Sequence, residues 1–193
     1  ACRAPGIIEP EDWESAWNRV LAAYPVLRSA IAWEGLDKGL QVVLKEAPIA
    51  VQIIDASGDD DALFSDRVAK LRSSEIELGF DLRRAPLLRQ TLLQRKDHSV
   101  VFWTYHHILM DGWSAFVVLG EVLAAYGAAL EGQSWIPRQA ASYKAFLDWR
   151  AAQDLGAAEQ YWRQALSGMR AATPLGLVER HDATPAMVAD TVL

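Results

Sequence analysis

The stretch Ser99–Ser114 constrains the fold most, because a strand pattern passes through a few polar residues directly into a helix pattern. Residues 100–105 are apolar, aromatic or β-branched, and a second apolar run begins at residue 115. Side chains alternate across a strand, so the even-numbered residues share one face with His106 and the odd-numbered ones share the other with His107. The two histidines are therefore predicted to point in opposite directions.

This geometry limits the chemistry of the two histidines. A metal ion held by both is not favoured, because ligands must converge to about 2 Å from one point. An imidazole with a pKa near 6.5 suits proton transfer at neutral pH, and Asp111-Gly112 offers a carboxylate and a tight turn beside it. His107 is then the candidate base. The residues alone leave a second interpretation open, in which the histidines are half-buried and Asp111 only caps the following helix.

The run 106–114 resembles the His-His-x-x-x-Asp-Gly-Trp-Ser signature of condensation domains from nonribosomal peptide synthetases, with every fixed position filled. The resemblance implies that the catalytic residues are those at the fixed positions of the signature: His106, His107, Asp111 and Gly112. A second segment, Tyr24–Ser29, is similar to the family motif Arg-His-x-x-Leu-Arg-Thr. That motif implies a structural salt bridge between Arg28 and Asp111, although Ala23 and Tyr24 stand here for its Arg and His.

Two looser motifs extend the resemblance over about residues 7–180. The segments 80–82 and 86–89 resemble the Phe-Asp-Leu and Pro-Leu-Leu-Arg sequences of the family. Tyr143, Phe146 and Trp149 resemble its Tyr-x-Asp-Phe-x-x-Trp motif, in which Ala145 replaces the Asp; read without the family, they are ordinary core residues. The fold implied is an α/β lobe, a two-layer sandwich that forms the N-terminal half of the chloramphenicol acetyltransferase-like fold.

The implied reaction is amide formation between a donor acyl thioester and an acceptor aminoacyl group, both carried on phosphopantetheine. Its partners would be donor and acceptor carrier proteins, a C-terminal lobe of the same domain and neighbouring synthetase modules. No directly bound cofactor and no metal are expected, because the thioester is already activated. His107 either takes the amine proton or only orients the amine, and backbone amides near Gly112 are candidate oxyanion donors. Alternatives are a related thioester-dependent acyltransferase, an epimerisation domain, or a non-catalytic domain that recruits partners.

Composition excludes several other classes. The 193 residues are 51% hydrophobic and carry a formal charge of −6 without a basic cluster, which fits one core and argues against nucleic-acid binding. Cys2 is the only cysteine, and no apolar run approaches the roughly 20 residues of a membrane span, so a cytoplasmic protein is expected. Ser114 lacks the sequence of a nucleophile elbow. We expect residues 1–193 to be one lobe, truncated at both ends, without the second lobe.

Periodicity and turn residues predict the order of the elements. Helices are expected over 11–24, 61–78, 115–130, 142–152 and 157–167, and strands over 26–33, 40–46, 49–54, 87–94 and 99–107. The helix at 115–130 is expected to be buried on nearly every side, and the helix at 61–78 to turn Leu63 inward. His98 is predicted to be solvated in a turn, and His181 to be exposed in an extended tail from residue 171. Arg28 is expected to point outward or to pair with an acid.

Overall fold

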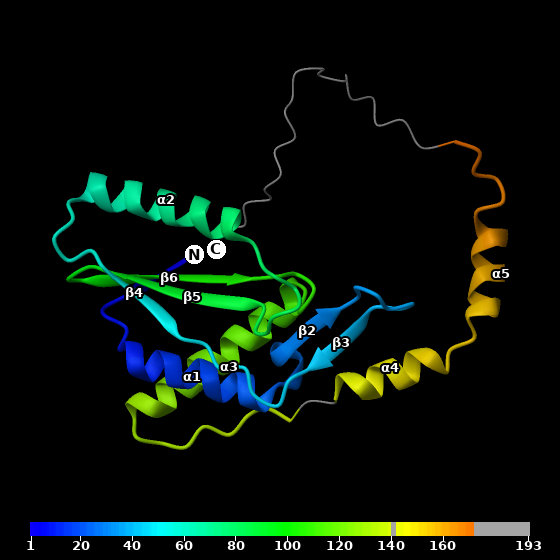
Figure 1. The fold of residues 1–193 in the computed structure, drawn as a ribbon, viewed down its shortest axis with the longest axis horizontal. Helices are drawn as coiled ribbons and strands as arrows, with labels where there is room; N and C mark the ends of the chain where they lie inside the picture. Colours follow the sequence, from blue (N-terminus) through cyan, green and yellow to red (C-terminus); the bar gives the residue numbers. More distant parts are fainter. Residues whose placement is uncertain (140–141, 172–193) are drawn as a thin grey trace. The chain divides into compact units, whose positions relative to one another are not determined.

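The computed structural model describes residues 1–139 and 142–171 (Figure 1). These residues belong to two compact units, of which the first ends at Gln139 and the second begins after it. The first unit holds all of the described strands and the first three helices.

A four-stranded sheet organises the first unit, in the order β1-β6-β5-β4. Its strands are β1 (Cys2–Pro5), β4 (Val51–Asp55), β5 (Leu88–Gln94) and β6 (His98–Tyr105). β5 and β6 form the antiparallel hairpin that the sequence predicts, and β1 pairs antiparallel with β6. β4 runs parallel to β5, since the helix α2 (Asp61–Leu78) makes the crossover between them. The strand β1 was not predicted.

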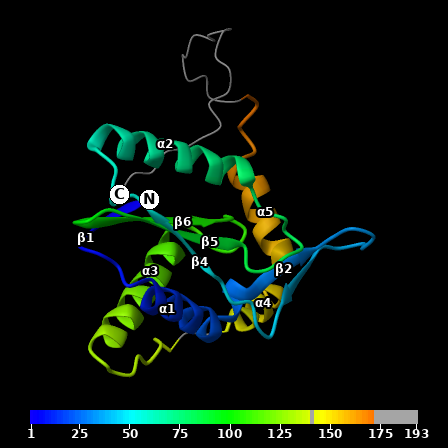
Figure 2. The ribbon, with the colours of Figure 1, turned by 60° about the vertical axis from the view of Figure 1, so that its left-hand side comes forward.

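Helices cover both faces of this sheet. α1 (Pro10–Ala23) and α3 (Gly112–Leu130) lie together on one face, and α2 lies on the other (Figures 1 and 2). The larger core holds Trp13, Trp17 and Leu92 among others, while Phe64 of α2 packs on Val100 and Phe102. The α/β class is thus confirmed, and α2 adds a layer to the expected two.

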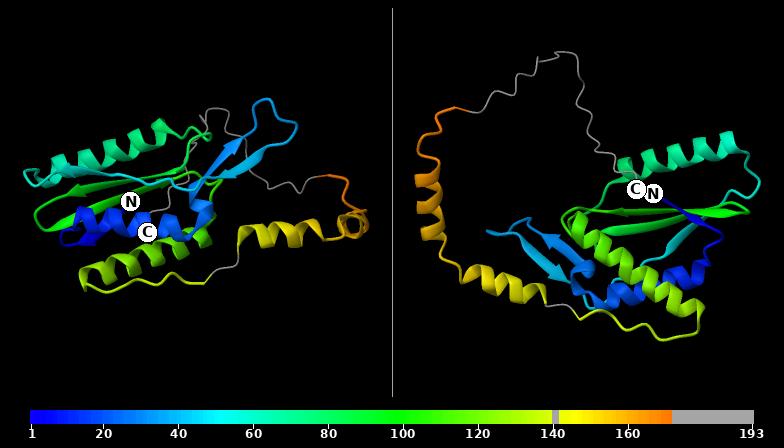
Figure 3. Two further views of the ribbon diagram at one scale, coloured as in Figure 1. Left: turned by 60° about the horizontal axis from the view of Figure 1, so that its bottom comes forward. Right: turned by 180° about the vertical axis from the view of Figure 1, so that it is seen from behind.

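A second hairpin consists of β2 (Ser29–Ala32) and β3 (Leu40–Val43), which pair antiparallel (Figure 3). The sequence predicts this hairpin but starts its first strand too early. Residues Pro25–Arg28 form a 3₁₀ turn, in which the Leu27 N–H donates to the Tyr24 carbonyl at 3.0 Å. Pro25 fixes a φ that suits such a turn, and Leu27 is fully buried there.

Two of the predicted helices differ from the prediction in their buried faces; α2 has the predicted bounds, and α3 begins three residues before the predicted residue 115. α2 begins at the Asp60 cap, whose side chain accepts the Leu63 N–H, yet Leu63 itself is 48% exposed. α3 buries one stripe that includes Val118, Val122 and Ala125, and leaves Phe116 54% exposed. By length and composition alone α3 is apolar enough to cross a membrane, but its buried stripe is part of the core.

His98 is a clear correction. It is 4% exposed, because it is the first residue of β6 and not a turn residue. Its ring meets the edge of Phe64 at 5.2 Å between centroids, and its Nδ1 lies 2.9 Å from the Asp97 carboxylate. The turn before β6 is one residue shorter than predicted.

The second unit contains α4 (Tyr143–Ala151) and α5 (Leu155–Ala165). Along α4, Phe146 stacks between Tyr143 and Trp149, and all three side chains are about half exposed. The described residues of these two helices include none that is buried, so the prediction of core aromatics does not hold within this unit. His181 and the predicted extended tail lie outside the described residues.

Candidate active site in the loop between β6 and α3

The signature residues form a short, braced loop between β6, which ends at Tyr105, and α3, which begins at Gly112. The His106 N–H donates to the Leu87 carbonyl at 3.0 Å, so the hairpin ladder continues one residue beyond the strand. The Leu109 N–H donates to the His106 carbonyl at 3.0 Å, and Leu109 and Met110 are buried. Two buried side chains and a closed turn fix the path of the loop.

His107 is exposed at the surface of this loop. Its Nδ1 lies 3.2 Å from the Met110 carbonyl oxygen. A carbonyl only accepts, so Nδ1 carries the hydrogen in this contact and Nε2 of the neutral ring holds the lone pair. No described residue hydrogen-bonds that Nε2. The loop therefore presents a base nitrogen whose tautomer is set by its own backbone.

His106 has the opposite tautomer. Its Nδ1 accepts the Ile108 N–H at 3.1 Å, so a neutral ring carries its hydrogen on Nε2. Its ring lies at 90° to that of Phe80, with 6.3 Å between centroids. His107 instead contacts Tyr105, at 5.5 Å between centroids. The two rings thus have different aromatic neighbours, and their opposite directions stay a prediction.

A row of aromatic rings leads from the core to His107. Each ring contacts the next: Trp17 lies 5.1 Å from Trp103, and Trp103 lies 4.9 Å from Tyr105, measured between centroids. Trp17 is fully buried, so the row ties the exposed imidazole to the core of the lobe. Burial raises the pKa of Tyr105, and the negative charge of Asp111 raises it further, so this hydroxyl stays protonated at neutral pH.

Asp111 caps α3. Its Oδ1 accepts the Ser114 N–H at 2.8 Å, and this hydrogen bond is the main reason why the pKa of Asp111 is lowered. The positive charge of a protonated His107 lowers that pKa slightly further. Gly112 follows as the first helical residue, and a Cβ built on it would meet nothing within 4 Å. The backbone there faces open space.

The predicted ion pair between Arg28 and Asp111 is not formed in the structure. The Arg28 Nε donates to the Leu44 carbonyl at 3.1 Å, and Nη1 donates to the carbonyls of Leu21 and Ala22, at 2.7 Å for Ala22. Leu21 and Ala22 lie in the last turn of α1, where unpaired carbonyls carry partial negative charge and attract a cation. Arg28 thus caps α1 and holds the start of the β2–β3 hairpin. The Asp111 carboxylate instead accepts a hydrogen bond from the first turn of α3.

Tyr24, which replaces the His of the second motif, also has a structural contact. Its hydroxyl donates to the Arg138 carbonyl at 3.1 Å. Burial raises its pKa, and the neighbouring Glu121 carboxylate raises it further. Glu121 is itself buried and accepts the Arg138 N–H at 3.2 Å. These contacts fasten the segment after α3 to the end of α1.

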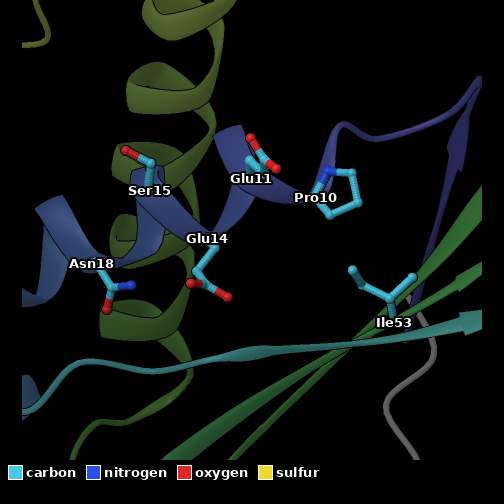
Figure 4. A pocket seen from close by; sticks show the side chains of 6 residues that line it. All are labelled: Pro10, Glu11, Glu14, Ser15, Asn18 and Ile53. Carbon is cyan, nitrogen blue, oxygen red and sulfur yellow. The ribbon is translucent and has the colours of Figure 1, made fainter.

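Two shallow hollows in the first unit lie away from the signature loop. One, of about 240 Å³, lies between α1 and β4, where the side chains of Glu14 and Asn18 point toward the strand (Figure 4). Glu14 accepts the Val51 N–H at 2.8 Å, and Asn18 exchanges two hydrogen bonds with the backbone of Ile49. These polar groups complete the outer edge of the sheet. The other hollow, of about 140 Å³, is lined by Arg28 and its neighbours.

Sequence reasoning found the signature residues but missed their supports, Phe80 and the Met110 carbonyl. Phe80 belongs to a Phe-Asp-Leu segment that the sequence singles out, yet nothing in its spacing shows that it meets His106. Every residue has a backbone carbonyl, so the sequence cannot indicate which one contacts His107. Among the described residues no group of three His, Cys, Asp or Glu side chains converges on a point where a metal ion fits.

Comparison with known proteins identifies the family. The family model described as the condensation domain matches residues 1–193. Chondramide synthase cmdD of Chondromyces crocatus is 37% identical over 175 residues, which are 90% of this chain and 4% of that protein. Bacitracin synthase 3 of Bacillus licheniformis is 30% identical over 179 residues, which are 92% of this chain and 3% of that protein.

The fold agrees with this match. A variant of the starter condensation domain of the rhizomide synthetase RzmA superposes with a TM-score of 0.77 at 22% identity, over 89% of this chain and 42% of that one. The chain therefore spans less than half of that solved structure and a few per cent of the curated relatives. It belongs to the condensation domain family.

Proposed function

We propose that this chain supplies the catalytic histidine for amide bond formation in nonribosomal peptide synthesis. The observation that carries the proposal is the exposed imidazole of His107, whose Nδ1 is bound to the Met110 carbonyl, so that Nε2 is the basic nitrogen of the neutral ring. The acceptor amine attacks the donor thioester carbonyl, the C–N bond forms, and the C–S bond breaks to release a thiol. His107 Nε2 takes the proton of the attacking amine and passes it to the departing sulfur.

Asp111 assists through its charge. The carboxylate caps α3 and carries a negative charge in the same loop as His107, which would offset the positive charge that forms during the proton transfer. This role replaces the ion pair with Arg28. Since the same carboxylate neutralises the start of α3, backbone amides near Gly112 are less suited to hold an oxyanion than the sequence suggested.

The substrates and partners in this proposal follow from the relatives. Donor and acceptor would arrive on the phosphopantetheine arms of carrier proteins, and neighbouring synthetase modules and a C-terminal lobe of the same domain would complete the cleft. The chain covers only 42% of the solved condensation domain, which supports a need for further residues around His107. No cofactor of its own takes part in this scheme, and the cytoplasm is the proposed location.

The test is a substitution in the full polypeptide that contains these residues. His107→Ala should lower the rate of amide formation by about 100-fold or more, as expected for loss of a general base. Product is measured by mass spectrometry with both carrier proteins loaded. His98→Ala removes a histidine at the opposite end of the same strand and serves as the control. Turnover of the His107→Ala protein at the wild-type level would overturn the proposal.

A further inference from the structure

Arg89 is a charged residue whose contacts the proposed mechanism leaves unused. It lies on β5 and reaches across to the end of α2. Its Nε donates to the Glu75 carboxylate and its Nη2 to the Glu75 carbonyl, both at 2.9 Å, and its Nη1 donates to the Gly79 carbonyl at 2.5 Å. Glu75 is buried and also accepts from Thr91 at 3.3 Å. These anchors hold the guanidinium in a single plane.

That plane lies against an aromatic ring. The Arg89 Cζ is 4.1 Å from the centroid of Phe80, within the range of a cation–π contact. Phe80 directly follows Gly79, whose φ of 56° ends α2 and turns the chain toward the sheet. Phe80 also meets His106, perpendicular to it at 6.3 Å between centroids, and packs against the larger core. Phe80 therefore contacts both a fixed cation and the first histidine of the signature.

We propose that Arg89 is a positioning residue of the active site, which fixes the ring of Phe80 and through it the imidazole of His106. His106 in turn receives the Ile108 N–H on Nδ1 and the Leu109 N–H on its carbonyl. A rotation of its ring breaks the Ile108 bond, which is one of the contacts that hold the turn carrying His107. The inference rests on the proposed function and deepens it, because it concerns the same loop.

The molecule contains a matched control at the opposite end of the same hairpin. The Arg95 Cζ lies 5.1 Å from the centroid of Phe64, and Phe64 meets His98 edge-on at 5.2 Å. This second Arg–Phe–His stack has the same chemistry, yet His98 is the first residue of β6 and His106 follows its last. A substitution of Arg95 therefore tests the effect of breaking such a stack without touching the signature loop.

The first test follows histidine ring resonances by NMR in the 193-residue chain. Arg89→Lys keeps a cation for Glu75 but loses the planar stack, and Phe80→Leu keeps the ion pair but loses the ring. Both should shift the His106 ring signals and the Ile108 amide and leave the His98 ring unchanged, whereas Arg95→Lys should do the reverse. Because Arg89 acts through Phe80, Arg89→Lys should add no further shift of the His106 ring in the Phe80→Leu background.

His106 signals that stay at their wild-type positions in Phe80→Leu overturn the inference, and so does a full Arg89→Lys shift in the absence of the ring. Phe80→Leu alone decides the matter if the lysine variant does not fold, because it retains the Glu75 pair. In the full polypeptide, Arg89→Lys should lower kcat for amide formation about 10- to 100-fold with little change in KM, and Arg95→Lys should not. If that polypeptide forms no amide, the proposed function fails, while the NMR shifts still decide the role of Arg89.

Discussion

At the scale of single residues, two adjacent histidines of the loop have opposite hydrogen-bonding roles, because their Nδ1 atoms contact different backbone atoms. His106 accepts an N–H on Nδ1, and His107 donates from Nδ1 to a carbonyl. The first arrangement uses the basic nitrogen of the neutral ring in a backbone hydrogen bond, and the second leaves Nε2 as the basic nitrogen. Two identical side chains therefore differ in tautomer because of the turn that Leu109 and Met110 hold in place.

Substitutions of Asp111 distinguish its observed role as the cap of α3 from the ion pair with Arg28 that the motif implies. Asn caps a helix about as well as Asp, so Asp111→Asn should keep the melting temperature close to that of the wild type, while Asp111→Ala should lower it. Thermal unfolding followed by circular dichroism gives both values. If an ion pair with Arg28 were formed, both variants would lose it and both would melt early.

The sequence indicates the site's residues better than it indicates their contacts. The alternation predicts opposite faces for His106 and His107, since a strand has a period of two, but β6 ends at Tyr105 and both histidines lie in the loop that follows. The pairing of Arg28 fails because the motif says nothing about distance, and nearby carbonyls at the end of α1 are closer partners. The predicted turn before β6 was one residue too long, so His98 was assigned to the turn. It is the first residue of the strand, and its ring lies in the core.

At the scale of elements, Arg28 connects α1 to the β2–β3 hairpin. Its guanidinium bridges carbonyls of the last turn of α1 and the Leu44 carbonyl that follows β3. The hairpin itself exposes much of its surface, including Leu40 at 53%. A cation that satisfies several otherwise unpaired carbonyls is therefore a main attachment of the hairpin to the lobe.

Arg28→Met should accordingly destabilise the lobe by about 1–2 kcal/mol, the range for lost hydrogen bonds to a charged group that is partly exposed. Urea denaturation measures the free energy of unfolding, and hydrogen exchange should show the largest loss of protection in residues 29–43. Combined with Asp111→Ala, the effect should be additive, because the two residues share no contact. A coupling energy above about 1 kcal/mol would show that they interact after all.

Helix and strand bounds were predictable to the extent that local signals mark them. The Asp60 cap and the positive φ at Gly79 give α2 the bounds that the sequence predicts, and Gly132, with φ 65°, follows the end of α3. Exposure was less predictable. α3 is apolar around most of its circumference, so periodicity gives no reason to expect Phe116 at the surface. Which stripe is buried depends on α1, which packs against it.

At the scale of the whole molecule, the charge pattern predicts sensitivity to acid. The pKa values of five aspartates are lowered in the folded chain, by hydrogen bonds from Arg95, Arg83, His98 or a backbone N–H: Asp55, Asp61, Asp81, Asp97 and Asp111. A depressed folded pKa stabilises the native state above the unfolded value of about 3.9 and ceases to do so as the pH falls through the folded pKa. All five shifts act in the same direction.

The urea midpoint should therefore decline steeply below about pH 4. High salt should weaken the part of this decline that comes from Asp61 with Arg95 and Asp81 with Arg83, because exposed ion pairs are screened. The part that comes from Asp55 and Asp111, which accept backbone N–H groups, should persist. A midpoint that stays constant from about pH 5 to about pH 2 would contradict the assignment.

The placement of two histidines in succession at the end of β6 also bears on insertions and deletions. Both faces of this strand are apolar, so polarity alone does not oppose a slip of one residue against β5. Such a slip, or the loss of one codon within the strand, would bring the other imidazole to the face that now bears the base. The lobe would still present a histidine there, but without the carbonyl that selects its tautomer. Variants of this kind would keep a complete signature in their sequence and yet lack a functional base.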